Sequence, residues 1–229
     1  MAFHTLFPTY VYRDRLASGG GANARAIPRL LRELTDEAKI LSEIDIDGQE
    51  WSAKNYLNGF TSYGSLDSLH SYSPTFASLA KVLAPHVRRF SKKQHWDLQG
   101  GRLELVSMWV NIMPPGAVHS LHLHPLSVVS GTVYLSVPKG TSPIKFEDPR
   151  LDRFMAQPPR LSATPPNLRP FYLCEPKAGD VILFDSWLRH EVPQVPQHVK
   201  SSKRKATRGQ NRSLPKENRI SVSFNFDWF

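Results

Sequence analysis

The stretch LELVSMWVNI, residues 103–112, is dominated by apolar, aromatic and β-branched residues and predicts a β-strand. A Pro-Pro-Gly turn at residues 114–116 follows it, and His122-Leu123-His124 comes next. Further strands are predicted at residues 131–137 and 180–189, and His190 directly follows the second of these. The three histidines therefore lie at predicted strand ends, where the open end of a β-barrel would be.

The spacing of these histidines favours a metal site. Side chains at positions i and i+2 leave the same face of a strand, so we expect His122 and His124 to converge on one ion while Leu123 packs behind them. His119, three residues earlier, should point away. Two such imidazoles and a third ligand from a distant strand are typical of a redox-metal site that keeps open coordination positions. A Cys-rich zinc site is excluded, because the chain has one cysteine. The alternative is a chance His-x-His, since the chain has nine histidines.

The C-terminal segment alternates strictly between polar and apolar residues. Arg219, Ser221 and Ser223 alternate with apolar residues at positions 220, 222 and 224, so the polar side chains should share one strand face. Inside a barrel that face can line a ligand cavity, whereas on an edge strand Arg219 would be an ordinary surface residue.

Several segments together resemble a family of 2-oxoglutarate and Fe(II)-dependent oxygenases of bacteria and phages. The matching segments are residues 122–125, 130–135, 146–150, 179–184 and 219–225. The resemblance also reaches residues 6–9, 51–52 and 59–65, so it covers nearly the whole chain. The resemblance implies a mainly β chain with α-helices, folded as a double-stranded β-helix, or jelly roll, that N-terminal helices brace. It also implies an iron site at the open end of that jelly roll.

The resemblance places His122 and His190 on two iron-binding positions. His124 falls where the wider superfamily most often has Asp or Glu, and we keep it as the third ligand. A neutral imidazole there leaves the site one unit more positive than a carboxylate would. Asp185 could instead supply the carboxylate or contact a ligand, although it is also a plausible turn residue.

The same resemblance implies that Arg219 binds the distal carboxylate of 2-oxoglutarate. A guanidinium can pair with a carboxylate through two hydrogen bonds, and Ser221 can add a third from the same strand face. Asn111 and Tyr134 are weaker candidates for cosubstrate contacts, because a polar residue in a strand is as often structural.

The expected activity is that of a non-haem Fe(II)- and 2-oxoglutarate-dependent dioxygenase, with hydroxylation the commonest reaction in the superfamily. Two alternatives stay open: a three-His dioxygenase of cupin type that does not use 2-oxoglutarate, and a non-catalytic jelly-roll binding protein. A small molecule or a peptide is the expected substrate, but jelly-roll folds act on many classes of compound and the sequence does not choose among them. The native metal and the oligomeric state are equally open.

Length and composition predict one domain over residues 1–229, with a helical and loop part at 1–100 and the jelly-roll core at 101–229. The single cysteine excludes an internal disulfide framework and favours a cytoplasmic protein. The first residues do not resemble a signal peptide, and no apolar run has transmembrane length.

The N-terminal part should contain two helices. One is predicted over residues 27–44, with Pro28 in its first turn. The other should begin near Pro74, and Pro85 should kink it or end it before Val87. The segment 48–71 between them is predicted to be an ordered loop.

The net charge of +9 is concentrated in one stretch. Seven lysines and arginines lie between Lys200 and Lys216, and removing their charge from the total leaves +2. The stretch lacks apolar periodicity, so a mobile, solvated loop over about residues 198–217 is expected. The alternative is a tether for an anionic partner such as nucleic acid, which we do not favour.

Overall fold

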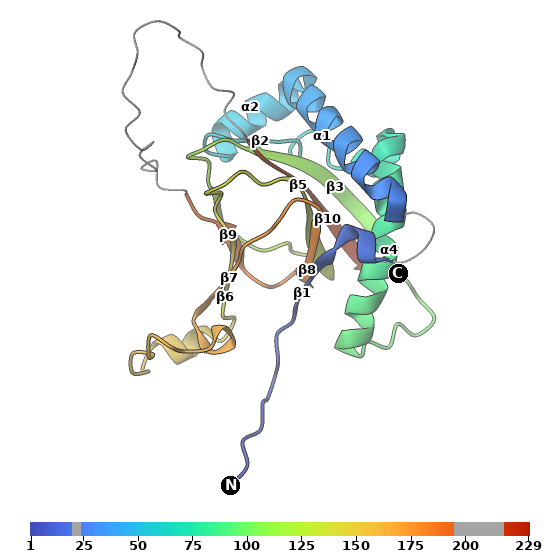
Figure 1. The fold of residues 1–229 in the computed structure, drawn as a ribbon. Coiled ribbons are helices and arrows are strands. Elements are labelled where there is room, and N and C mark those ends of the chain that lie inside the picture. The colour runs from blue at the N-terminus through green and yellow to red at the C-terminus, as the bar shows by residue number, and fades with distance from the viewer. Residues whose placement is uncertain (20–23, 195–217) are drawn as a thin grey trace, which may run out of the picture.

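The computed structural model of the chain describes residues 1–19, 24–194 and 218–229 (Figure 1). The basic loop expected over about residues 198–217 therefore lies outside the described residues.

The larger of two antiparallel sheets has six strands in the order β1-β8-β5-β10-β3-β2. Its strands are β1 (Val11–Arg15), β2 (Phe60–Thr61), β3 (Leu103–Met113), β5 (Val129–Ser136), β8 (Asp180–Asp185) and β10 (Arg219–Trp228). The C-terminal strand β10 lies inside this sheet between β3 and β5. The last strand of the chain therefore pairs with β3, the first strand of the predicted core.

The smaller sheet has the order β4-β9-β6-β7 and faces the inner side of the larger one (Figure 1). Its strands are β4 (His119–His122), β6 (Ile144–Glu147), β7 (Phe171–Cys174) and β9 (His190–Val192). The two facing sheets form the jelly roll that the sequence predicted. Short 3₁₀ turns at Leu16–Gly19, Ala24–Ala26, Leu151–Phe154 and Pro166–Leu168 complete the regular structure.

Helices from the first hundred residues cover the outer face of the larger sheet (Figure 1). They are α1 (Ile27–Ile44), α3 (Leu69–Tyr72) and α4 (Pro74–Gln94), whereas α2 (Ile46–Asn55) lies beside β2 and its Trp51 packs against a separate buried cluster that includes Tyr56 and Met113. The prediction for α1 is confirmed, including Pro28 in its first turn. The loop predicted over residues 48–71 is wrong, because that segment contains most of α2, the short strand β2 and α3.

The sequence predicts that Pro85 kinks the second helix or ends it before Val87. The second of these outcomes is wrong, because α4 runs past Pro85 to Gln94. The turns after Pro85 bury His86, Val87 and Phe90 against the rest of the core. This burial outweighs the one backbone hydrogen bond that a proline removes.

The larger sheet separates two layers of apolar packing. On its outer face, residues of α1 and α4 pack with Val110, Val133 and Val222 in one buried cluster. On its inner face a smaller cluster includes Phe146 of β6 and Phe184 of β8. Helices therefore brace one side of the sheet, and the side that faces the smaller sheet is left to form the interior of the jelly roll.

Alternate residues of strand β10 face these two layers. Ile220, Val222 and Phe224 belong to the outer cluster, as expected for one face of a strand. Arg219 and Ser221 are buried on the opposite face, inside the jelly roll. The predicted alternation is confirmed, and it places a cation and a hydroxyl in the interior. No helix among the described residues has both the length and the apolar character needed to cross a membrane.

Candidate functional site

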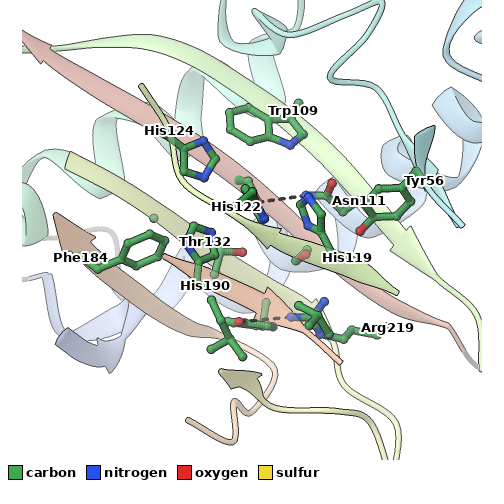
Figure 2. Close-up of a pocket in the computed structure, with 16 residues that line it drawn as sticks. Tyr56, Trp109, Asn111, His119, His122, His124, Thr132, Phe184, His190 and Arg219 are labelled. Atoms are coloured by element: carbon green, nitrogen blue, oxygen red, sulfur yellow. Dashed lines mark hydrogen bonds between the residues drawn. The ribbon is translucent and has the colours of Figure 1, made fainter. Parts of the chain in front are cut away.

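A pocket lies between the two sheets, with about 410 Å³ of empty space that includes its opening to solvent (Figure 2). Strands of both sheets contribute to its walls, and so does Tyr56 from the N-terminal part. All seven site residues predicted from the sequence line it: Asn111, His122, His124, Tyr134, His190, Arg219 and Ser221.

At one end of the pocket, the imidazoles of His122, His124 and His190 come together. One ring nitrogen of each lies within 4.8 Å of those of the other two, which is a geometry that could hold a metal ion. His122 ends β4 and His190 begins β9, and the two are direct partners across the β4–β9 pair. His122 and His190 thus lie at strand ends as expected, but the strand predicted over residues 180–189 is shorter, because β8 ends at Asp185 and His190 begins a separate strand.

Backbone carbonyls orient two of the three rings. The Nδ1 of His122 donates to the Ser120 carbonyl at 2.7 Å, and the Nδ1 of His190 donates to the Leu188 carbonyl at 2.9 Å. A proton held on Nδ1 leaves the lone pair on Nε2, which is how metal-binding histidines are commonly fixed. In both residues Nε2 is therefore the atom available to a metal.

His124 is held differently, through its backbone. Its N–H donates to the Ser186 carbonyl at 2.9 Å, and its ring lies 5.8 Å from the Trp109 ring. Strand β4 ends at His122, so His124 lies just beyond the strand. The expectation that Leu123 packs behind the pair is wrong, because Leu123 is exposed where the chain leaves the sheet.

Buried hydrogen bonds support the segment that holds His124. The Ser186 hydroxyl shares a hydrogen bond of 2.8 Å with that of Ser130, which also donates to the Asn225 side chain at 2.8 Å. Asn225 in turn donates to Ser107 at 3.0 Å. These bonds connect β3, β10 and β5 to the turn that His124 contacts.

The prediction that His119 points away is wrong. Its ring stacks on that of His122, with centroids 4.0 Å apart, and it lines the pocket (Figure 2). The cause is a register shift in the β4–β9 pair: His119 opposes Val192 and His122 opposes His190, so β4 has one extra residue between them. Such a bulge turns a side chain to the other face of the strand.

Burial lowers the pKa of all three clustered histidines. Burial, and after it the neighbouring His122, lowers the pKa of His124 to about 4. Burial and the neighbouring His122 and His124 lower the pKa of His190 well below its usual value. The pKa of His122 is also lowered, mainly by burial. The rings are therefore neutral near pH 7, as a metal requires of its imidazole ligands.

Arg219 lies elsewhere in the same pocket as a buried cation. Its Nη1 donates to the Met113 sulfur at 2.8 Å and its Nη2 to the Tyr134 hydroxyl at 3.3 Å, while its guanidinium lies 5.0 Å from the centre of the Tyr134 ring. Its Nε is buried without a hydrogen-bond partner. Within the part of the chain that the structure describes, no carboxylate forms an ion pair with it.

The other predicted cosubstrate contacts surround Arg219 and the histidines. Ser221 is paired in register with Asn111 on one side and Tyr134 on the other. The Asn111 amide donates to Ser223 at 2.9 Å, and its Oδ1 is buried without a partner. The pocket thus contains unused hydrogen-bonding capacity next to a cation.

The structure excludes Asp185 as a ligand. It is the last residue of β8 and lies on the same face as Val181 and Leu183, toward the helices. Its carboxylate accepts hydrogen bonds of 2.7 and 2.8 Å from the Gln94 amide of α4, and burial raises its pKa. Asp185 therefore connects the sheet to α4 and is not part of the histidine cluster.

Sequence reasoning missed other residues that line the pocket, among them Tyr56, Trp109 and Thr132. Strand period could have found two of them, since Trp109 lies two residues before Asn111 and Thr132 two residues before Tyr134. No comparable signal exists for Tyr56, which follows α2 and reaches the pocket only through the tertiary fold.

Residues 107–206 match a family model described as "Putative 2OG-Fe(II) oxygenase". The resemblance to 2-oxoglutarate and Fe(II)-dependent oxygenases is thereby confirmed. The match includes the three clustered histidines, whereas Arg219, Ser221 and Tyr56 lie outside it. No protein among those with curated descriptions matches the chain in sequence.

Solved structures of the same fold are similar over nearly the whole chain. A Pseudomonas putida prolyl-4-hydroxylase superposes with a TM-score of 0.56 at 14% identity, over 96% of this chain and 92% of that one. HygX from Streptomyces hygroscopicus, solved with nickel, 2-oxoglutarate and hygromycin B, gives 0.55 at 16% identity, over 96% and 83%. An oxidoreductase of the 2OG-Fe(II) oxygenase family from Burkholderia pseudomallei matches 67% of this chain, at 16% identity and a TM-score of 0.44. The match spans only 58% of the length of that protein.

Proposed function

We propose that the chain is a non-haem Fe(II)- and 2-oxoglutarate-dependent dioxygenase that hydroxylates a small molecule or a peptide. The observation that carries this proposal is that one pocket contains both a cluster of three neutral imidazoles and a buried arginine that no described carboxylate neutralises. The similarity to the oxygenase family and to solved oxygenase structures supports it.

The histidine cluster fits an open redox-metal site. His122, His124 and His190 supply three nitrogen donors, and the ring orientation of two of them leaves Nε2 free. An iron ion held by three side chains keeps coordination positions for other ligands, whereas a structural zinc site is closed by four. HygX, which shares the fold, has been solved with iron and with nickel, and a nickel structure of it contains 2-oxoglutarate as well.

The surroundings of Arg219 fit a carboxylate. A buried charge without an opposite charge is costly, so a pocket that retains one is suited to an anionic ligand. The guanidinium can offer two parallel hydrogen bonds to a carboxylate, and Ser221 and Tyr134 offer hydroxyl groups beside it. A 2-oxo dicarboxylic acid could then extend from Arg219 toward the histidines.

Bound iron and 2-oxoglutarate would supply the oxidation together with dioxygen: one oxygen atom of O2 would enter the succinate formed as carbon dioxide leaves the cosubstrate, and the other would enter the substrate C–H bond as a hydroxyl group. The protein's own contribution is positioning and exclusion of water. Carbonyl hydrogen bonds fix the His122 and His190 rings, and Phe184 and Trp109 form apolar walls beside the cluster (Figure 2). The remaining open side of the pocket is where a substrate would enter.

A three-His dioxygenase that does not use 2-oxoglutarate is the second candidate, because all three clustered ligands are neutral imidazoles. The placement of Arg219 argues against it, since such an enzyme has no use for a buried carboxylate anchor in the same pocket. A metal-free binding protein would need neither the three oriented imidazoles nor the arginine.

Anaerobic titration of the Fe(II)-loaded protein with 2-oxoglutarate tests the proposal, with His190→Ala as the control. We expect a visible metal-to-ligand charge-transfer band in the wild type that is absent from the variant. Iron binding without the band would favour the cupin-type reaction, and absence of iron binding would favour a binding protein. A screen of small molecules and peptides for succinate release would then address the substrate.

A further inference from the structure

Tyr56 has a buried hydroxyl with no hydrogen-bond partner among the described residues. The residue caps the C-terminal end of α2, and only 4% of its surface is exposed. A hydroxyl removed from water without a new partner costs free energy, and native proteins rarely leave one so. Because Tyr56 lines the pocket, a bound ligand is the natural partner.

The Tyr56 ring belongs to the surroundings of Arg219. It packs in a small buried cluster with Met113, Ala117 and Val192, and the Met113 sulfur accepts the hydrogen bond from Arg219 Nη1. The ring also makes an edge contact with the His119 ring, at a centroid distance of 4.9 Å. These contacts fix the ring, so its hydroxyl is held in place before any ligand arrives.

Two unused donors therefore occur in the same part of the pocket. The Nε of Arg219 and the hydroxyl of Tyr56 are both buried and without partners, and Figure 2 shows both side chains on the same side of the pocket. Burial raises the pKa of Tyr56, while the Arg219 charge acts in the opposite direction, which indicates that the two groups lie close enough to interact. At neutral pH the hydroxyl keeps its proton and can donate it.

We propose that Tyr56 donates a hydrogen bond to the same carboxylate that Arg219 binds, and so helps to select a 2-oxo dicarboxylic acid over a 2-oxo monocarboxylic acid. This inference rests on the proposed function. It adds a specificity-determining residue from the N-terminal part of the chain, outside the residues that match the family model. Binding of the cosubstrate would then connect the end of α2 to strand β10.

The test compares Tyr56→Phe with the wild type and with Tyr72→Phe, a matched change at a tyrosine that is 70% exposed. Each Fe(II)-loaded protein is titrated anaerobically with 2-oxoglutarate and, separately, with 2-oxobutyrate, which lacks the distal carboxylate. We expect Tyr56→Phe to weaken 2-oxoglutarate binding about tenfold or more, the usual effect of losing a hydrogen bond to a charged group. Its affinity for 2-oxobutyrate, and both affinities of Tyr72→Phe, should equal those of the wild type.

The outcomes separate this inference from the proposed function. If the wild type itself fails to bind 2-oxoglutarate, both ideas are overturned. If the wild type binds it and Tyr56→Phe binds it equally well, only the role of Tyr56 is overturned. An equal loss for both oxo acids would also overturn it, because the hydroxyl would then act on the metal end or on packing.

Thermal unfolding of the metal-free and ligand-free proteins gives a readout that is independent of binding. Removing a buried hydroxyl that has no partner should leave the melting temperature of Tyr56→Phe at or above that of the wild type. A lower melting temperature would mean that the hydroxyl already has a partner within the protein, which contradicts the inference.

Discussion

His122 and His190 oppose each other directly across the β4–β9 pair, and each donates its Nδ1 hydrogen to the carbonyl of the residue two positions earlier. The same type of hydrogen bond to a backbone carbonyl therefore fixes both rings, on two neighbouring strands. His124 has no such ring contact to a carbonyl among the described residues, and the hydrogen bond of its backbone N–H to Ser186 holds it instead. Of the three proposed metal ligands, His124 should thus be the one that tolerates replacement best.

Replacing His124 tests this difference between the ligands. We expect His124→Asp to keep iron, because its backbone anchor is unchanged, and to bind 2-oxoglutarate more weakly, because the site becomes one unit less positive. His124→Ala should lose at least about 100-fold in metal affinity, since changing even an outer-shell partner typically costs about 10–100-fold. Anaerobic calorimetry with Fe(II) measures both, with Leu123→Ala as the neighbouring control. Unchanged metal affinity in His124→Ala would remove His124 from the site.

Replacing Arg219 should separate stability from binding. In Arg219→Met the buried charge disappears, so the ligand-free protein should be as stable as the wild type or more stable, by up to about 4 kcal/mol. Binding of 2-oxoglutarate should fall by about 100-fold or more while iron stays bound. Arg219→Lys keeps the charge without the planar pair of donors, so its affinity for 2-oxoglutarate should lie between those of the wild type and Arg219→Met. Urea unfolding and anaerobic titration measure the two effects, and wild-type cosubstrate affinity in Arg219→Met would refute the anchor assignment.

Strand period is the reason that much of the site could be predicted. The alternation in β10 placed Arg219 and Ser221 together, and the same rule applied to β3 would have added Trp109 to Asn111. His119 could not be placed in this way, because its direction depends on a bulge that arises from pairing with β9. A register shift is a property of two strands, and the sequence of one strand does not contain it.

The N-terminal part shows the same limit. Local pattern and the first-turn proline gave the bounds of α1, whereas Pro85 misled because its local cost is opposed by packing of His86 and Phe90 in the tertiary structure. Tyr56 was missed for a related reason, since only the fold brings the end of α2 to the pocket.

The persistence of α4 through Pro85 has a measurable cost. A proline inside a helix lacks the N–H that would bond to the carbonyl four residues earlier, here that of the exposed Lys81. We expect Pro85→Ala to raise the free energy of unfolding by about 1–3 kcal/mol, somewhat less than the full helix penalty because alanine frees the unfolded chain. Pro74→Ala is the matched control, since Pro74 lies in the first turn where no N–H is needed. Urea unfolding measures both, and a loss of stability in Pro85→Ala would contradict the argument.

His86 should make stability depend on pH without any metal. Its ring is buried between the Tyr12 hydroxyl, at 2.8 Å from Nδ1, and the Leu16 carbonyl, at 3.1 Å from Nε2. Burial lowers its pKa below 6.5, opposed by the hydrogen bond to Leu16 and the charge of Asp14 and assisted by that of Arg89. The unfolded chain therefore takes up the proton first, so this contribution is fully present above pH 6.5 and is lost as the pH falls through the lower folded-state pKa. Urea unfolding of the metal-free protein between pH 7.5 and pH 5 should show a smaller loss of stability for His86→Gln than for the wild type. The control His4→Gln, at an exposed histidine, should lose as much stability as the wild type. Equal losses in all three proteins would show that His86 does not carry the effect.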